Sequence, residues 1–89
     1  MVASHPRGAR RLADRAELEQ EFEYTIESDD GTDNAHLYFA DKIDLDHPAF
    51  VRFDPLYELA EGIDRRVGGE TVVIPYIRVL RITKRKEPD

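Results

Sequence analysis

The chain of 89 residues has no cysteine, no tryptophan and a single methionine. Without cysteine it can form no disulfide and offers no thiolate ligand to a metal. No apolar run reaches the roughly 18–20 residues that a membrane-spanning helix needs, and no segment has the character of a signal peptide. We therefore expect a cytoplasmic protein that does not enter a membrane.

Charge is distributed unevenly along a chain that is long enough for one domain with a modest core. The net charge is +3 over residues 1–16, −13 over residues 17–64 and +4 over residues 65–89. An acidic middle between two basic ends is typical of a protein that binds two kinds of partner or associates with itself. The simpler interpretation is that the acidic loops are only solvated.

The first strand signals lie near the N-terminus. Phe22, Tyr24 and Ile26 alternate with polar residues, which is the pattern of a strand with one buried face. The segment 28–34 is rich in Asp, Asn and Gly and is typical of a turn. Residues 20–40 are therefore predicted to form a hairpin.

Further short strands are predicted after this hairpin. A turn over residues 44–48 precedes a strand at 49–53. Gly68-Gly69 indicates a tight hairpin turn that leads into a strand at 70–74. Pro75 has no backbone N–H, so it should interrupt the pairing before a last strand at 79–83.

Residues 54–62 carry signals for a helix of barely two turns. Asp54 suits the N-cap, Pro55 the first helical position and Gly62 the end of the helix. The apolar residues of this region recur at helical spacing: Leu56, Leu59, Ala60 and Ile63. A second helix of one or two turns is predicted over residues 9–17.

Together these elements predict an α+β domain that is mostly β. We expect a small, strongly bent antiparallel sheet, or an SH3-like or Sm-like barrel, of about five strands with one or two short helices. Residues 1–8 are predicted to be a flexible lead-in, residues 9–84 the single domain and residues 85–89 a charged tail.

No cofactor, metal site or catalytic motif is predicted. Asp41, Asp44, Asp46 and His47 lie close in sequence, but they lack the spacing of an EF-hand and are typical of a turn. The serines are not in a nucleophile elbow, the histidines are isolated from one another, and no phosphate-binding glycine loop is present. We therefore expect a protein that is not an enzyme.

Basic and apolar residues alternate near the C-terminus, which is the pattern of a strand that offers cations along one side. The residues predicted to bind a nucleic acid or another partner are Arg65, Arg66, Tyr76, Arg78, Arg81, Lys84 and Arg85. Arg65 and Arg66 are expected to fold back beside the last strand through the turn at Gly68-Gly69. Against nucleic-acid binding, a pI near 5.0 means that most of the surface repels phosphate.

The segment 73–82 (VIPYIRVLRI) resembles the I-P-x-H-R-I-x-x-I segment of the small RNA cyclic-group-end recognition domain. Two weaker parallels are the strand and acidic-Gly turn over residues 22–31 and the aromatic-x-x-x-Ile segment 39–43. Ile77 stands where the family has histidine, and the family's tryptophan-containing N-terminal segment has no counterpart. The resemblance implies RNA-end binding without catalysis, with Arg78 and Arg81 as the contacts.

Two functional hypotheses follow. The first is a small, non-catalytic binding module associated with RNA, through RNA ends or single strands. The second is a structural or adaptor protein that acts through protein–protein contacts, as an assembly, connector or immunity component. It rests on the charge distribution and on short strands that leave open sheet edges, to which a protein partner or a second copy of the chain could pair.

Overall fold

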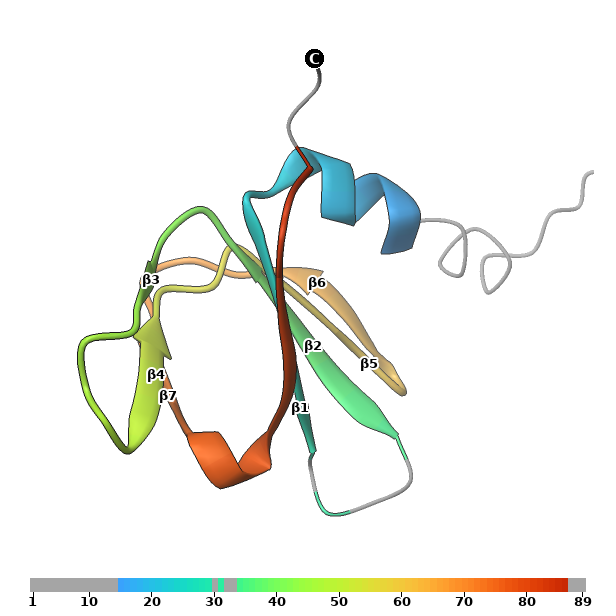
Figure 1. Cartoon of the computed structure of the whole chain (residues 1–89). Helices are drawn as coiled ribbons and strands as arrows, with labels where there is room; N and C mark the ends of the chain where they lie inside the picture. The colour runs from blue at the N-terminus through green and yellow to red at the C-terminus, as the bar shows by residue number, and fades with distance from the viewer. Residues whose placement is uncertain (1–14, 30, 32–33, 87–89) are drawn as a thin grey trace, which may run out of the picture.

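The computed structural model describes residues 15–29, 31 and 34–86. Residues 15–21 are helical, and eight strands and one short 3-10 helix follow (Figure 1). In chain order they are β1 (Tyr24–Asp29), β2 (Ala35–Ala40), β3 (Ile43–Asp44), β4 (Phe50–Phe53), β5 (Tyr57–Ala60), β6 (Ile63–Arg66), β7 (Val72–Pro75), η1 (Tyr76–Arg78) and β8 (Val79–Lys84).

The strands form two antiparallel sheets. The five-stranded sheet has the order β6-β5-β2-β1-β8, and the three-stranded sheet has the order β3-β4-β7. The predicted α+β, mostly β fold is therefore confirmed, with two antiparallel sheets where one bent sheet was expected. No closed barrel forms among the described residues, because β7 and β8 lie in different sheets and do not pair.

One face of the five-stranded sheet packs against the helical segment. Leu18 and Phe22 are four residues apart, so they lie on the same side of the helical turn. They join Leu37, Phe39 and Leu59 in a buried apolar cluster. Residues 18 and 22 thus belong to the helical layer, and the first strand begins at Tyr24.

The other face of the five-stranded sheet packs against the three-stranded sheet. Ile26 and Ala40 from the large sheet meet Val51, Phe53 and Ile74 from the small one, and all five are buried. Alternate residues of β2 thus pack into the two cores, Leu37 and Phe39 into the first and Tyr38 and Ala40 into the second, because side chains of a strand point to opposite faces. The result is three layers: helical segment, large sheet and small sheet.

The predicted helix over residues 54–62 is wrong. Residues 57–60 are the strand β5, which lies between β2 and β6, and Gly62 lies in the turn of the β5–β6 hairpin with a φ of +78°. A helix of two turns has little stability of its own. Pairing on both sides, with Leu59 buried in the first core, outweighs the local signals for a helix.

The hairpin turn predicted at Gly68-Gly69 is also wrong. These glycines connect β6, in the large sheet, to β7, in the small sheet, and the two strands are not paired with each other. The prediction of about five strands is also too low. The strand β3 has only two residues, and β5 and β6 lie where the sequence favours a helix or a turn.

Other predicted elements are confirmed within the described residues. The hairpin over 20–40 is β1 and β2, the strand at 49–53 is β4, and the last two strands are β7 and β8 with η1 at the break after Pro75. The predicted helix over 9–17 is found in part, because residues 15–21 are helical and residues 9–14 lie outside the described part. The lead-in 1–8 and tail residues 87–89 also lie outside it.

Candidate functional site

The predicted binding residues lie at opposite edges of the five-stranded sheet. Arg65 and Arg66 are on β6, at one edge, whereas Arg81 and Lys84 are on β8, at the other. The expectation that the two groups lie side by side is therefore wrong, since β6 pairs with β5 and not with the C-terminal strands. The sequence predicted one basic surface, and the fold makes two.

Arg65 is part of a charged cluster that joins three strands. Its guanidinium lies 2.8 Å from a carboxylate oxygen of Glu58, and the other carboxylate oxygen lies 2.5 Å from Nε2 of His36. Glu58 is only 8% exposed. Burial raises the pKa of Glu58, but the hydrogen bonds from Arg65 and His36 outweigh it, so the pKa lies below its ordinary value.

No local pattern in the sequence indicates this cluster, because its members come from β2, β5 and β6 and the region of β5 carries the signals of a helix. Tyr38 lies next to it: the His36 ring stacks on the Tyr38 ring with 4.6 Å between centroids. Burial, together with the negative charges of Glu58 and Glu70, raises the pKa of Tyr38. The cluster holds its charges in mutual contacts, so we interpret it as structural.

Arg66 and Arg85 both contact the helical segment. The Arg66 guanidinium lies over the Tyr57 ring and 3.5 Å from Glu21. Arg85 donates hydrogen bonds to the backbone carbonyls of Gln20 and Glu21, and it pairs with Glu23. Carbonyls in the last turn of a helix have no partner within the helix, so Arg85 caps this segment.

The remaining predicted residues divide into buried and exposed groups. Tyr76 is half-buried and packs against the second core. Lys84 lies 3.9 Å from Glu23. Arg78 is exposed, and its Nε donates to the backbone carbonyl of Asp29 at 3.3 Å. Arg81 is exposed, and its side chain has no hydrogen bond or ion pair with any described residue.

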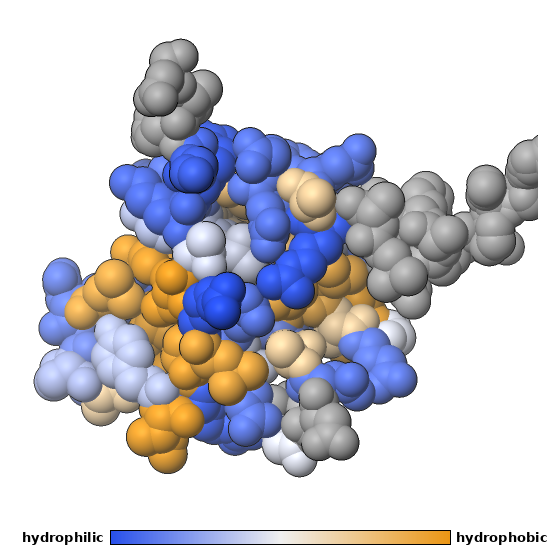
Figure 2. Space-filling model, turned by 45° about the vertical axis from the view of Figure 1, so that its right-hand side comes forward, coloured by the Kyte–Doolittle hydropathy of each residue, from blue (hydrophilic) through white to orange (hydrophobic). Residues whose placement is uncertain are grey.

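Large apolar side chains are exposed along the same C-terminal segment. Ile77 is 94% exposed, Leu80 59% and Val73 50%. We call these three residues the C-terminal patch. Figure 2 shows apolar surface gathered at the lower left of the view, at the level of η1 in Figure 1, with polar surface above it.

One signal in the sequence could have indicated part of this patch. Val79 and Leu80 are adjacent in a strand, and adjacent side chains point to opposite faces. Val79 packs against the second core, so Leu80 is turned away from it. The pairing of β1 with β8 also shifts register at Glu27/Ser28, opposite this position.

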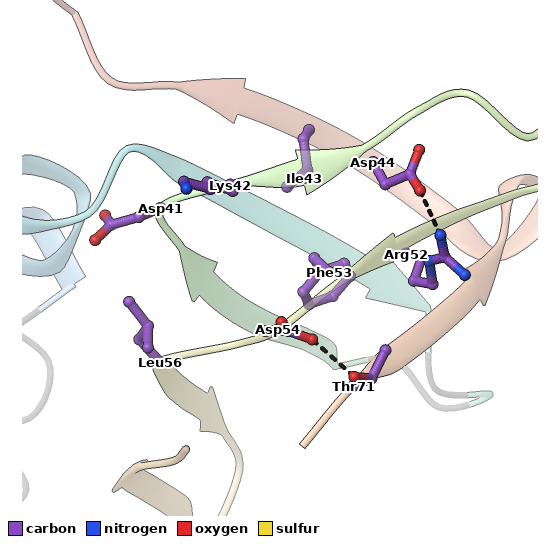
Figure 3. A pocket seen from close by; sticks show the side chains of 9 residues that line it. All are labelled: Asp41, Lys42, Ile43, Asp44, Arg52, Phe53, Asp54, Leu56 and Thr71. Carbon is purple, nitrogen blue, oxygen red and sulfur yellow. Dashed lines mark hydrogen bonds and ion pairs between the residues drawn. The ribbon is translucent and has the colours of Figure 1, made fainter. Parts of the chain in front are cut away.

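A pocket of about 580 Å³ is lined by carboxylates that already have partners. Asp44 pairs with Arg52 at 2.7 Å, and Asp54 accepts a hydrogen bond from Thr71 at 2.7 Å. A hydrogen bond from the backbone N–H of Asp46, together with Arg52, lowers the pKa of Asp44. Figure 3 shows the carboxylates spread around the pocket and not converging on one point.

No group of three or more His, Asp or Glu side chains within the described residues is arranged to hold a metal ion. Nor is any helix in that part of the chain long and apolar enough to cross a membrane. The C-terminal patch, with Arg78 and Arg81 beside it in the sequence, is therefore the candidate functional surface.

Comparison with known proteins adds no relative: no family model, no curated protein and no solved structure matches this chain.

Proposed function

We propose that this protein is a non-catalytic interaction module that binds a partner protein through the C-terminal patch. The observation that carries the proposal is the exposure of Ile77, which is 94% accessible and lies between Val73 and Leu80 in the sequence. A single exposed leucine or isoleucine is ordinary on a protein surface, but several large apolar side chains exposed along one short segment are typical of an interface. Ile77 and Leu80 are three residues apart and flank Arg78.

The sheet edges beside the patch also support a protein partner. β7 is at the edge of the small sheet and β8 is at the edge of the large one, and no described strand pairs with the outer side of either. An unpaired edge offers backbone N–H and C=O groups to an incoming strand. Exposed apolar side chains and the guanidinium groups of Arg78 and Arg81 on this surface provide contact area and positive charge.

Affinity capture with matched variants tests this function. The double variant Ile77→Ser/Leu80→Ser removes the apolar patch, and Leu45→Ser is the control, because Leu45 is 52% exposed in the loop between β3 and β4. We expect wild type and Leu45→Ser to retain the same partner from an extract of the native cells, and the double variant to lose it. Equal retention by all three would overturn the proposal.

RNA binding is the second candidate, and the exposure of Arg81 without an ion pair in the described structure favours it. Arg78 is exposed as well, whereas Arg65, Arg66 and Arg85 contact carboxylates of the chain itself. Fluorescence anisotropy with single-stranded RNA ending in a 2′,3′-cyclic phosphate or a 3′-hydroxyl tests it. Binding that weakens in Arg78→Ala and Arg81→Ala would favour RNA, and no binding at low salt would exclude it.

A further inference from the structure

A small pocket, of about 230 Å³, lies along the outer edge of β7. All four residues of β7 line it, and no residue of β4 does. Since consecutive residues of a strand point to opposite faces, a pocket that all of them line must run beside the backbone. The opposite wall comes from β1 and β2, through Ser28, Asp29, His36 and Tyr38, and Arg78 contributes from η1.

The pairing of β7 with β4 fixes which backbone groups face this pocket. The N–H of Tyr76 donates to the carbonyl of Ala49, just beyond the paired residues of β4. In an antiparallel pair the two backbone groups of one residue point to the same side, and alternate residues point to the same strand. The backbone groups of Tyr76 and Ile74 therefore point to β4, and those of Val73 and Pro75 point to the pocket.

The position of Pro75 agrees with this assignment. Its missing N–H would point away from β4, so the small sheet loses no hydrogen bond. The outer edge of β7 thus offers both backbone groups of Val73. These are the groups with which an extended peptide pairs when it adds to a sheet.

Arg78 places a positive charge at this edge. Its Nε is held by the carbonyl of Asp29, and its two terminal nitrogens have no hydrogen bond or ion pair with any described residue. The carboxylate of Asp29 itself accepts a hydrogen bond from the backbone N–H of Gly31. A guanidinium anchored at one nitrogen presents its remaining donors in a fixed plane, which suits a carboxylate.

We propose that the edge pocket of β7 receives the carboxylate-bearing end of an extended peptide segment of the partner. The segment pairs with the backbone of Val73, and its carboxylate binds the Arg78 guanidinium. This inference rests on the proposed function and names the chemistry of the partner. The pocket holds the end of a segment rather than a whole strand, and the rest of the segment lies over the C-terminal patch.

The charges argue for a peptide of this kind over a second copy of the chain paired through β8. A symmetric antiparallel pair centred on Arg81 would bring two arginines directly opposite each other, and like charges in that position are destabilising. An apolar segment with a carboxylate meets the same surface without such repulsion.

Peptide selection on the intact chain provides the test. Peptides are selected from a random library with free C-termini, then synthesised as the free acid, as the carboxamide, and as a carboxamide with an aspartate at the last position. We expect the free acid to bind at least about tenfold more tightly than the plain carboxamide. The aspartyl carboxamide tells whether a side-chain carboxylate serves equally well.

Arg78→Gln should remove the difference between acid and carboxamide. Lys86→Gln, which removes the same charge from an exposed position after β8, should preserve it. Equal affinity of acid and carboxamide in the wild type would overturn the inference, as would a library that yields no peptide while RNA binds. Neither result changes what the capture experiment with Ile77→Ser/Leu80→Ser measures. The inference about the peptide can therefore fail while the proposed function still holds.

Discussion

At the scale of single residues, buried charge is concentrated at Glu58. Its carboxylate contacts Arg65 on one side and His36 on the other, and both contacts cross between strands. A buried carboxylate is costly unless its oxygens are paired, so the two partners decide whether Glu58 stabilises or destabilises the domain. Its lowered pKa indicates that the charged form is favoured in the folded state.

Glu58→Gln should therefore reduce the free energy of unfolding at neutral pH by about 2 kcal/mol, because hydrogen bonds to a charged group are lost. A carboxyl group whose pKa is lowered by folding stabilises the protein above its unfolded-state pKa, and this contribution disappears as pH falls through the folded-state value. The difference between wild type and variant should shrink below pH 4.5, the ordinary value of the group.

Urea unfolding at pH 7 and at pH 3 measures this change. Glu17→Gln is the control, because Glu17 is exposed on the helical segment. A difference that is the same at both pH values would show that the charge of Glu58 is not responsible.

At the scale of elements, β5 and its turn show where local signals fail. The sequence from Asp54 to Gly62 has the capping residues and apolar spacing of a helix, yet residues 57–60 form a strand. A strand between two neighbours is decided by contacts with residues that are distant in sequence, here β2, and no local pattern contains them. The hairpin of β1 and β2 was predictable because its alternation and its turn are both local.

The turn of the β5–β6 hairpin provides a prediction at this scale. Gly62 has a φ of +78°, which side chains other than glycine disfavour, and no atom lies within 4 Å of the position of a Cβ there. Gly62→Ala should destabilise the domain by about 1–2 kcal/mol through backbone strain alone. Gly68→Ala, in equally open space but without a positive φ, should be neutral or slightly stabilising.

Thermal unfolding of the two glycine variants separates these effects. Equal loss of stability in both would mean that the backbone conformation at Gly62 is not what the hairpin requires.

At the scale of the whole molecule, folding brings oppositely charged segments of the sequence into contact. Basic residues from β6 and from the end of β8 meet carboxylates of the helical segment and of the residues that follow it. Figure 1 shows the end of β8 lying beside the helical segment, although they are far apart in sequence. The binding roles predicted for these cations from sequence stay untested, but their contacts give them a structural role.

Arg85→Lys tests the contacts between Arg85 and the helical segment. Lysine keeps the charge but cannot reach two carbonyls and Glu23 with one planar group, so the free energy of unfolding should fall by about 1 kcal/mol. Helical content measured by circular dichroism should fall at lower urea than in the wild type. Lys86→Ala, at the next residue, should leave both unchanged; if it has the same effect as Arg85→Lys, the capping contacts are not the cause.

The missing N–H of Pro75 limits how far another strand can pair along the outer edge of β7. A strand edge with an unbroken row of donors and acceptors can template the addition of further chains, as in fibres. On β7 the row is broken after Val73, because Pro75 has no N–H to donate. We therefore expect an added strand to pair with only one short segment of this edge.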